Sequence, residues 1–449
     1  MKVLEPSLND EDLAQLECDT FKYFADEMNP ENGLIPDSTR QGAPSSIAVV
    51  GFALTAYPIG VERGYMTRAE AIKRCLMTLR FFHDGPQGTG PDALGYKGFY
   101  YHFLDMKTGR RVWESEISTI DTTYVLAGAL TAAMYFDLET KEEREIRKLA
   151  GVLCSRADWH WAQNGGLTVA HGWKPETGFI KYRWTGYNEA LILYVLGLAS
   201  PTFPLPEDSY RAWTRSYKWK KLYGHEFLYA GPLFVHQLAH MWIDFRGIQD
   251  EYMTGKAIDY FENSRRAIYA QQAYAMRNPK KLVGYDRYCW GITASDGPGP
   301  AVRRINGRTR RFYDYVARSI PYGPDDGTLA PWAVVASLPF APEVVLPSLK
   351  RINEHHPEMT SKYGFKCSYN PTFTAGNRKQ KGWVSKGYYG LDQGPIVMMI
   401  ENYRSGLLWR LMRQCPYIIN GLRRAGFRGG WLGDDRVHQG RTRLSRRIR

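Results

Sequence analysis

Two kinds of helical segment alternate along this chain, and this alternation limits the fold more than any other feature. The first kind is amphipathic, with a single apolar stripe such as Ile72, Leu76 and Leu79. The second kind is apolar on nearly every side and rich in small residues. A helix that is apolar all round must be buried, whereas an amphipathic helix can cover it from outside. The chain therefore predicts an inner layer of helices within an outer one.

The segments number six of each kind. The amphipathic segments are 8–28, 67–84, 139–160, 207–221, 250–277 and 342–354, and the apolar segments are 45–60, 118–136, 187–199, 232–243, 327–338 and 391–403. Strict alternation of six outer and six inner helices predicts an all-α fold, an (α/α)6 barrel with parallel inner helices. A small β-hairpin is expected within 96–113, turning at Lys107-Thr108-Gly109. Long loops that follow no helical period, at 161–186, 278–326 and 361–390, are expected to build a site.

Charge is concentrated at one end of the chain. The net charge of the 449 residues is +13, and residues 422–449 hold nine Arg against two Asp. We therefore predict one catalytic domain over 1–427 and a basic, disordered tail over 428–449, and we do not predict a nucleic-acid-binding protein. No apolar run is long enough for a membrane span, and residues 1–6 show no hydrophobic signal region, so the chain as written is cytoplasmic or lacks a leader. We expect a monomer.

Three acidic residues fall in the first turns of apolar segments. They are Asp121 in Ser118-Thr-Ile-Asp, Glu189 in Gly186-Tyr-Asn-Glu and Asp392 in Gly390-Leu-Asp-Gln. If the inner helices run parallel, these acids share one rim and face a common cleft, as glycoside hydrolysis requires of its two carboxyl groups. The alternative is helix capping, because the helix dipole favours acids at this position and Ser118-x-x-Asp121 fits a capping box.

Aromatic side chains cluster in the same loops and helix ends. Trp184, Tyr187, Trp242 and Trp290 are among them, and an aromatic-lined cleft with acids suits a carbohydrate. Ordinary core packing is the competing interpretation for about half of them. We also expect polar contacts to substrate from Arg246, Asp296 and Gln393, although Asp296 lies in Ala-Ser-Asp-Gly-Pro, which is turn chemistry first.

His236 and His240 have the i, i+4 spacing of a zinc helix. Gln237 stands where that motif needs a glutamate, and neither paired cysteines nor a third ligand are evident. We therefore expect no metal. There is also no phosphate-binding glycine loop, and we expect no cofactor.

Six blocks of sequence, in order, resemble one known family. They are STIDTTYVLAGAL, GYNEALILYVLGLASPTFP, HQLAHMWIDFRG, YCWGITASDGP, DDGTLAPWAVVASLPFAPE and GLDQGPIVMMIENYRSGLLW. Together they resemble the glycoamylase-like family, which includes the endo-β-1,2-glucanases of glycoside hydrolase family 144 and a domain of cyclic β-1,2-glucan synthases. The resemblance extends over about 20 to 427.

The resemblance implies an (α/α)6 barrel that cleaves β-1,2-glucan with inversion at the anomeric carbon. The family's Glu in GYNEA corresponds to Glu189, its Asp in the DQGP block to Asp392, and its acid in STIDT to Asp121. Glu189 would then be the general acid, acting directly or through a substrate hydroxyl, and Asp392 the general base. Asp121 would bind substrate or support Glu189. A first-turn position should lower the pKa of Asp392, as suits a base.

Other functions remain open at this point. A transglycosylase, or an exo-acting enzyme that releases sophorose, would share these residues and differ only in its loops. A non-catalytic glucan-binding protein would not need all three acids. Binding of nucleic acid would depend on the arginine-rich tail alone.

Overall fold

The computed structural model describes residues 9–305, 307–374 and 382–433, and it is mostly helical. The predicted inner segments contain α2 (Ile47–Glu62), α4 (Thr119–Tyr135), α7 (Leu191–Ala199), the 3-10 helices η1 (Leu233–His236) and η2 (Leu238–Met241), α11 (Pro331–Val335) and α13 (Gly390–Arg404). Every residue of α2 from Ile47 to Gly60 is buried, as is every residue of α7. These segments form the core because they offer no polar face to water.

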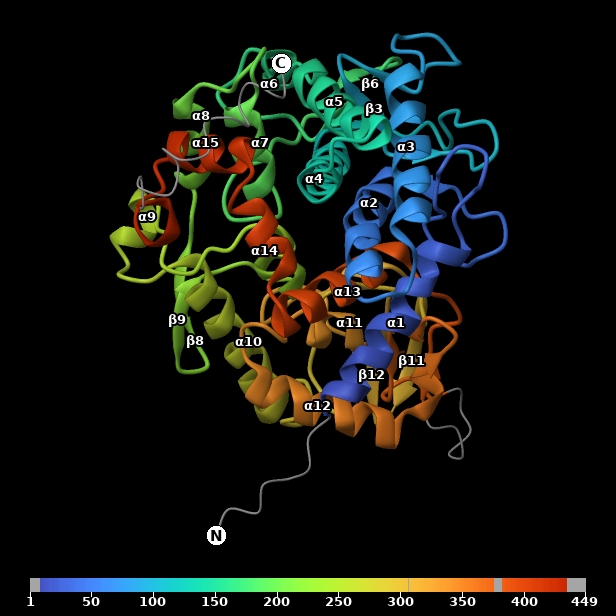
Figure 1. The fold of residues 1–449 in the computed structure, drawn as a ribbon. Coiled ribbons are helices and arrows are strands. Elements are labelled where there is room, and N and C mark those ends of the chain that lie inside the picture. The colour runs from blue at the N-terminus through green and yellow to red at the C-terminus, as the bar shows by residue number, and fades with distance from the viewer. Residues whose placement is uncertain (1–8, 306, 375–381, 434–449) are drawn as a thin grey trace.

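The amphipathic segments form the outer helices. They are α1 (Asp10–Asp26), α3 (Arg68–Asp84), α5 (Lys141–Arg156), α8 (Glu207–Thr214), α9 (Glu251–Thr254) with α10 (Tyr260–Arg277), and α12 (Pro342–His355). Several begin at side-chain caps that the sequence supplies: Thr67 accepts a hydrogen bond from the N–H of Glu70, and Asp259 accepts one from that of Glu262. Figure 1 shows α1, α3, α5, α10 and α12 at the periphery, around α2, α4 and α13.

Three inner segments are shorter than predicted, and one of them is α7, which begins at Leu191 although the prediction began at residue 187. Residues 232–243 form two 3-10 turns rather than one α-helix. The break falls at Gln237, whose φ of −122° lies outside the helical range. The amide of that buried glutamine donates to the carbonyl of Ala333 and the hydroxyl of Ser337, so the backbone positions the side chain for these partners. The helix in 327–338 starts only at Pro331, whose fixed φ suits the first turn.

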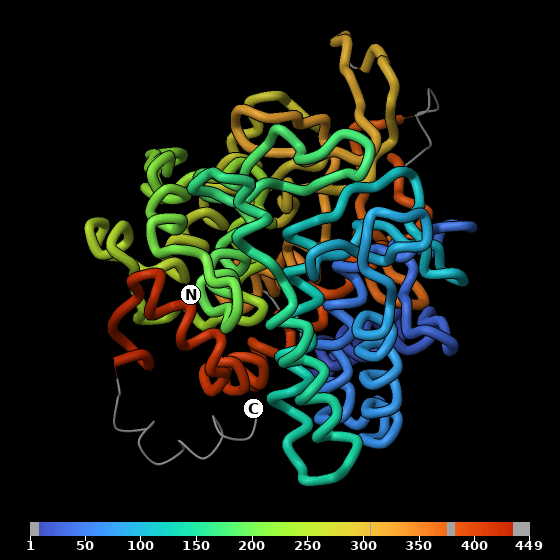
Figure 2. The backbone as a smooth tube through the Cα atoms, turned by 90° about the horizontal axis from the view of Figure 1, so that it is seen from above, coloured from blue at the N-terminus to red at the C-terminus, as the bar shows by residue number. Residues whose placement is uncertain are grey.

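Neighbouring inner helices pack directly on one another. Helix α2 packs against α4 and α13, α13 against α11, and α4 against α7. The closest approach is between α2 and α4, where a Cβ on Gly128 would lie 2.1 Å from the carbonyl oxygen of Gly51. Glycine is therefore required at this crossing, since no side chain fits between the two backbones. Figure 2 shows the backbone from above; helices such as α4 are seen from the side, and long loops gather towards one end of the molecule.

The β-structure is limited and differs from the single hairpin expected. The turn at Lys107-Thr108-Gly109 does form, since the Asp105 N–H donates to the Arg110 carbonyl and Leu104 pairs with Arg111. Residues 99–101, however, pair with 95–96 and 117–118 in a five-stranded sheet ordered β2-β3-β5-β6-β7. The strands of this sheet are β2 (Gly95–Tyr96), β3 (Phe99–Tyr101), β5 (Ile117–Ser118), β6 (Gly172–Lys174) and β7 (Gly178–Phe179).

The remaining strands form two-stranded antiparallel pairs. They are β1 (Ser45–Ser46) with β4 (Phe103–Leu104), β8 (Trp219–Leu222) with β9 (His225–Leu228), β10 (Ala294–Ser295) with β13 (Val316–Ala317), β11 (Ala301–Ile305) with β12 (Arg308–Phe312), β14 (Thr360–Ser361) with β15 (Gly364–Phe365), and β16 (Tyr369–Asn370) with β17 (Trp383–Val384). They lie in the long loops and at helix starts, so the loops have local structure of their own.

After α13 the described chain ends in the short helices α14 (Leu407–Met412) and α15 (Pro416–Arg424) and the 3-10 helix η4 (Gly430–Leu432). A further 3-10 helix, η3 (Pro357–Met359), follows α12. Residues 428–433, assigned to the tail by their charge, pack on the folded body: Arg428 pairs with Gln249, and the indole of Trp431 donates to the carbonyl of Asp244. The predicted tail from 434 onwards lies outside the described residues.

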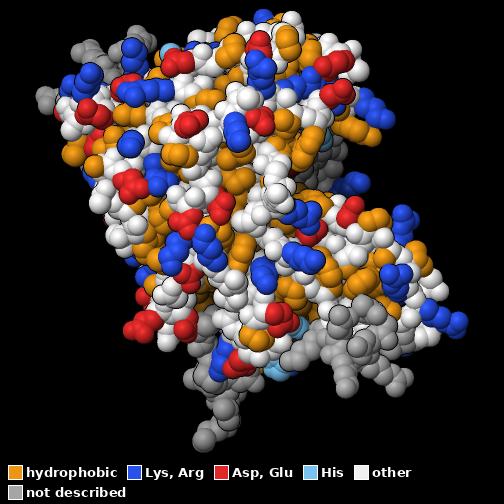
Figure 3. Space-filling view, turned by 90° about the vertical axis from the view of Figure 1, so that its right-hand side faces the viewer, with side chains coloured by type: hydrophobic (Ala, Val, Ile, Leu, Met, Phe, Trp, Pro, Cys, Tyr) orange, Lys and Arg blue, Asp and Glu red, His pale blue; other side chains and the backbone are white. Residues whose placement is uncertain are grey.

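The surface carries charged side chains of both signs (Figure 3). Figure 3 shows Lys and Arg side chains interspersed with Asp and Glu over the face that it presents. Within the described ranges, none of the helices combines the length and the apolar character needed to cross a membrane.

Candidate active site

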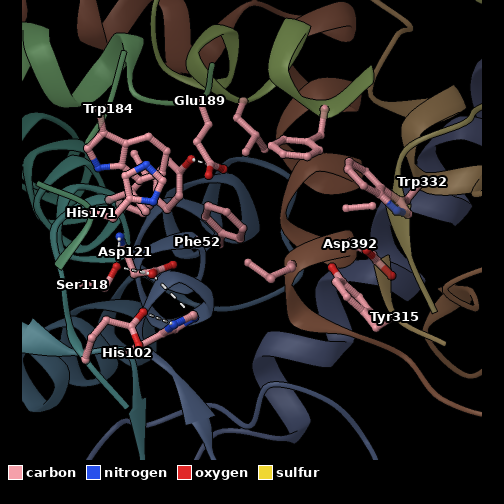
Figure 4. A pocket seen from close by; sticks show the side chains of 17 residues that line it. Phe52, His102, Ser118, Asp121, His171, Trp184, Glu189, Tyr315, Trp332 and Asp392 are labelled. Carbon is pink, nitrogen blue, oxygen red and sulfur yellow. Dashed lines mark hydrogen bonds and ion pairs between the residues drawn. The ribbon is translucent and has the colours of Figure 1, made fainter. Parts of the chain in front are cut away.

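Three acidic residues predicted from the sequence line one cavity of about 300 Å³. Asp121, Glu189 and Asp392 come from the starts of three different inner segments, and Figure 4 shows Asp392 across the cavity from Asp121 and Glu189. The starts of α4, α7 and α13 therefore lie around one space. Carboxyl groups on facing walls can act on the two sides of a bond held between them.

Each acid is positioned differently by the local backbone. Asp121 lies in the first turn of α4, where its N–H donates to the side chain of Ser118 and its carboxylate accepts from the Ser118 hydroxyl. Asp392 lies in the first turn of α13, as predicted. Glu189 does not lie in a first turn, because α7 begins only at Leu191, and the glutamate occupies the turn before it. The prediction that Glu189 lies in the first turn of a helix, where the helix dipole favours an acid, is therefore wrong.

Glu189 combines burial with a nearby charge. Burial raises its pKa to about 7, and the charge of Asp121 contributes to the increase. The hydroxyl of Tyr124 lies 3.5 Å from its Oε2 and favours the charged form. A carboxyl group with this pKa is partly protonated near neutral pH, which is the property needed to donate a proton.

Asp392 behaves differently from the sequence-based expectation. Burial raises its pKa well above the ordinary value, and this effect exceeds any lowering by its first-turn position. The thiol of Cys367 lies close enough to the carboxyl group to lower this pKa in part, but neither carboxylate oxygen has a partner of ordinary hydrogen-bond geometry among the described residues. Buried polar atoms normally have partners, so these two oxygens are an exception that points to a functional role.

A charged network that the sequence analysis missed supports Asp121. His102 Nδ1 lies 3.0 Å from Glu116, and its Nε2 lies 3.6 Å from Asp121. Burial alone would lower the pKa of His102, but Asp121, Glu116 and Asp37 outweigh it and raise this pKa to about 9. His102 is thus a cation at neutral pH, between two carboxylates. Its position in Tyr-His-Phe, between two short strands, carries no motif that would have identified it.

Aromatic residues line the cavity, but they are only partly the ones predicted. Trp184 is confirmed as a lining residue; its indole N–H donates to Thr119, and the ring of His171 stacks on it at 3.7 Å. Phe52, Tyr315 and Trp332 also line the cavity and were not selected from the sequence. Figure 4 shows Trp184 and Trp332 on opposite sides. Aromatic faces on both walls suit the apolar C–H faces of sugar rings.

Three of the predicted aromatic residues do not line the cavity. Trp290 is fully buried, and its indole donates to the hydroxyl of Ser348. Trp242 is also fully buried, donates to Thr55 and stacks on Tyr124 from behind the cavity wall. Tyr187 packs against Tyr217, Tyr260 and His236. Core packing, the alternative considered for these side chains, explains all three.

The predicted polar contacts are also displaced from the cavity. Arg246 forms an ion pair with Asp244 and lies over the ring of Trp409, a residue of α14. Gln393 points away, since its amide donates to the carbonyl of Phe365. Asp296 does not line the cavity either, but it holds Arg40 at 2.8 Å and accepts from Ser385.

The two histidines with the spacing of a zinc helix, His236 and His240, are buried in the core. His236 contacts the carbonyl of Ala230, His240 contacts the hydroxyl of Ser264, and burial lowers the pKa of both imidazoles, to about 4 for His236 and about 3 for His240. Two consecutive 3-10 turns also break the helical spacing that would bring them together. Within the described ranges, no cluster of three or more His, Cys, Asp or Glu side chains has the arrangement to hold a metal ion.

Comparison with known proteins identifies a family and several similar enzymes. The family model described as "Putative glucoamylase" matches residues 181–416. A curated relative, the exo beta-1,2-glucooligosaccharide sophorohydrolase (non-reducing end) of Parabacteroides distasonis, is 27% identical over 455 residues. The match covers 93% of this chain and 58% of that protein, so the chain spans less than two thirds of the length of this relative.

Solved structures are similar over almost the whole chain. A "putative glucoamylase" of Bacteroides uniformis is 32% identical with a TM-score of 0.83, and the match covers 96% of this chain and 100% of that one. The endo-beta-1,2-glucanase of Chitinophaga pinensis, solved with sophorotriose and glucose, is 27% identical with a TM-score of 0.82 and coverages of 95% and 100%.

Proposed function

Because this chain belongs to the glycoamylase-like family, we propose that it hydrolyses β-1,2-linked glucan by an anomer-inverting mechanism. The observation that carries the proposal is the pair of carboxyl groups, Glu189 and Asp392, on facing walls of one aromatic-lined cavity. The sophorohydrolase of Parabacteroides distasonis and the endo-beta-1,2-glucanase of Chitinophaga pinensis are named for β-1,2-linked glucans or glucooligosaccharides, which supports the same linkage here.

The finer architecture that we propose is the (α/α)6 barrel. Support comes from the contacts of neighbouring inner helices, α7–α4–α2–α13–α11, and from outer helices in the predicted order. In this arrangement η1 and η2 fill the sixth inner position. A single hydrophobic cluster runs through nearly all of these elements, so we treat the described chain as one catalytic domain.

Glu189 is the proposed general acid. With a pKa of about 7 it holds a proton in about half of the molecules at neutral pH, and it can transfer that proton to the leaving oxygen directly or through a substrate hydroxyl. The nearby carboxylate of Asp121 contributes to the raised pKa of Glu189 and so favours the protonated form of Glu189. His102 in turn pairs with Asp121 and holds that carboxylate in place.

Asp392 is the proposed general base. Its two oxygens, which have only the weakly donating thiol of Cys367 nearby, can accept hydrogen bonds from a water molecule on the opposite face of the sugar ring. Such hydrogen bonds favour the charged carboxylate and lower its pKa from the high value of the buried group. The base is therefore activated when the reacting water occupies the site.

Endo-acting hydrolysis is the main form of the proposal, and an exo-acting enzyme or a transglycosylase is the alternative. Similar proteins of both endo and exo type are known by name, and the lining residues described above serve either mode. A binding protein without activity is less favoured, because a carboxyl group with a pKa near 7 is needed for proton transfer and not for holding a sugar.

Incubation with linear β-1,2-glucan tests the proposal. Proton NMR of the first product formed should show the α-anomer, and size separation over time should show a ladder of oligosaccharides. Release of one disaccharide from the start would select the exo alternative, and products longer than the substrate would select transfer. A β-anomer would contradict the inverting mechanism, because retention needs a nucleophile about 5 Å from the acid.

A further inference from the structure

A strained turn presents an exposed tryptophan beside the cavity. In the turn 112–115 the N–H of Ser115 donates to the carbonyl of Val112, and the two central residues, Trp113 and Glu114, have φ values of 56° and 49°. Consecutive positive φ angles are typical of turns built from Asn-Gly, because Asn and Gly tolerate this conformation. Trp and Glu do not, so the turn keeps a backbone conformation that its own sequence disfavours.

The surroundings of the turn hold it in this conformation. The guanidinium of Arg111 donates to the carbonyl of Ser115 across the turn, and it is itself paired with Glu176 at 2.6 Å. The hydroxyl of Ser115 bonds the backbone of Phe103. The strain is therefore maintained by specific contacts on both sides, as is typical of strained positions with a function.

Trp113 gains little from packing in return. It is 70% exposed, the highest value among the large hydrophobic residues of the described chain. Its one ring contact is with Phe103, at 5.1 Å between centroids. A single exposed indole is common on protein surfaces, but an exposed indole that is also held at a disfavoured positive φ is a combination typical of a functional position.

Ring contacts connect Trp113 to the cavity. Phe103 stacks on His102 at 3.9 Å, and His102 lines the cavity beside Asp121. The order His102, Phe103, Trp113 thus runs from the cavity wall to the molecular surface. A glucan chain that leaves the cavity past His102 would meet the exposed indole face next.

We propose that Trp113 is a stacking platform for a sugar residue of the substrate, outside the cavity and remote from the cleaved bond. This inference rests on the proposed function, and it adds that the enzyme prefers chains long enough to reach the turn. The exposed face is apolar, uncharged and planar, which suits the C–H face of a glucose ring.

The test separates stacking from structure by relieving the strain. The double variant Trp113→Asn with Glu114→Gly gives the turn residues that suit its φ angles. The melting temperature of this variant protein should therefore equal or exceed that of the wild type. KM for long linear β-1,2-glucan should rise about 10-fold, as expected for the loss of one well-packed aromatic contact, while kcat stays within about twofold. KM for the shortest β-1,2-glucooligosaccharide that the enzyme cleaves should change much less, because the effect depends on a chain that extends beyond the cavity. Trp113→Phe should restore most of the affinity for the long glucan.

Tyr403→Ala is the matched control. Tyr403 is also an exposed aromatic residue, but it lies near the end of α13 opposite to Asp392. This variant should leave KM for both substrates unchanged. If the double variant binds long glucan as the wild type does, the platform is refuted, and a lower melting temperature or an altered oligomeric state with unchanged KM would likewise refute it. If the wild type neither binds nor cleaves β-1,2-glucan, the proposed function itself fails.

Discussion

The raised pKa of Glu189 predicts a pH-dependent effect on stability that is independent of any activity assay. In the native protein this pKa is about 7, against an ordinary value of 4.5, which corresponds to roughly 3 kcal/mol at 1.36 kcal/mol per pH unit. A carboxyl group whose folded pKa is raised contributes full stability below pH 4.5 and loses it as the pH rises through 7. Glu189→Gln cannot ionise and so avoids this loss.

The expected shift in melting temperature follows from the size of the protein. A chain of 449 residues has an unfolding entropy of roughly 0.9 kcal/mol/K at about 2.1 cal/mol/K per residue. We therefore compare the difference in melting temperature, Glu189→Gln minus wild type, at two pH values. This difference should be about 3 °C larger at pH 8 than at pH 4. At both pH values kcat should be lower by at least about 10²-fold, because the proton donor is lost.

Thermal unfolding followed by circular dichroism at pH 4, 6 and 8 provides the measurement. Glu354→Gln is the control, since Glu354 is an exposed acid whose ion pair with Lys350 contributes little, and its shift should be the same at every pH. An equal shift for Glu189→Gln at pH 4 and pH 8 would refute the reasoning. It would mean that ionisation of Glu189 does not destabilise the native protein. The raised pKa, on which the proposed role of Glu189 as general acid depends, would then be absent.

Three other variants or treatments test separate parts of the site. Asp121→Asn should move the alkaline limb of the kcat/KM profile to lower pH, because the charge of Asp121 helps to raise the pKa of Glu189; an unmoved limb would contradict the coupling. Trp290→Ala should destabilise the fold by about 3–5 kcal/mol in denaturant titration with glucan affinity unchanged, and a loss of affinity without destabilisation would return Trp290 to the binding site. Exhaustive chelation should leave activity within about twofold, and a loss restored by one divalent ion would show that metal takes part in the reaction.

The sequence identified the core and two of the three acidic first turns because both follow from local patterns. A segment such as 45–60 is apolar on all sides, and burial is the consequence whatever surrounds it. Asp121 follows the capping serine Ser118, and Asp392 stands at the start of an apolar run, so their placement needed no tertiary information. The resemblance of six blocks to one family added the substrate, which no local pattern contains.

The sequence patterns did not separate core aromatics from cleft aromatics. Trp184 and Trp290 both lie beside loops rich in glycine, yet the first lines the cavity and the second bonds Ser348 in the core. The difference depends on which helix packs on each ring, and α12 supplies the Ser348 hydroxyl from 58 residues away. The same limit explains the missed role of His102, whose charge depends on carboxylates brought together by separate strands and helices.

The pKa values of the two candidate catalytic residues were determined only by the tertiary structure. Helix position suggested a lowered pKa for Asp392, but burial raises it, and the thiol of Cys367 offsets this increase only in part. The dipole at a helix start acts within one turn and is a property of the local sequence, whereas desolvation depends on every side chain that surrounds the carboxyl group. Local sequence thus determined where the acids stand along the chain, and the packing of distant segments around them decided which protonation state each one holds.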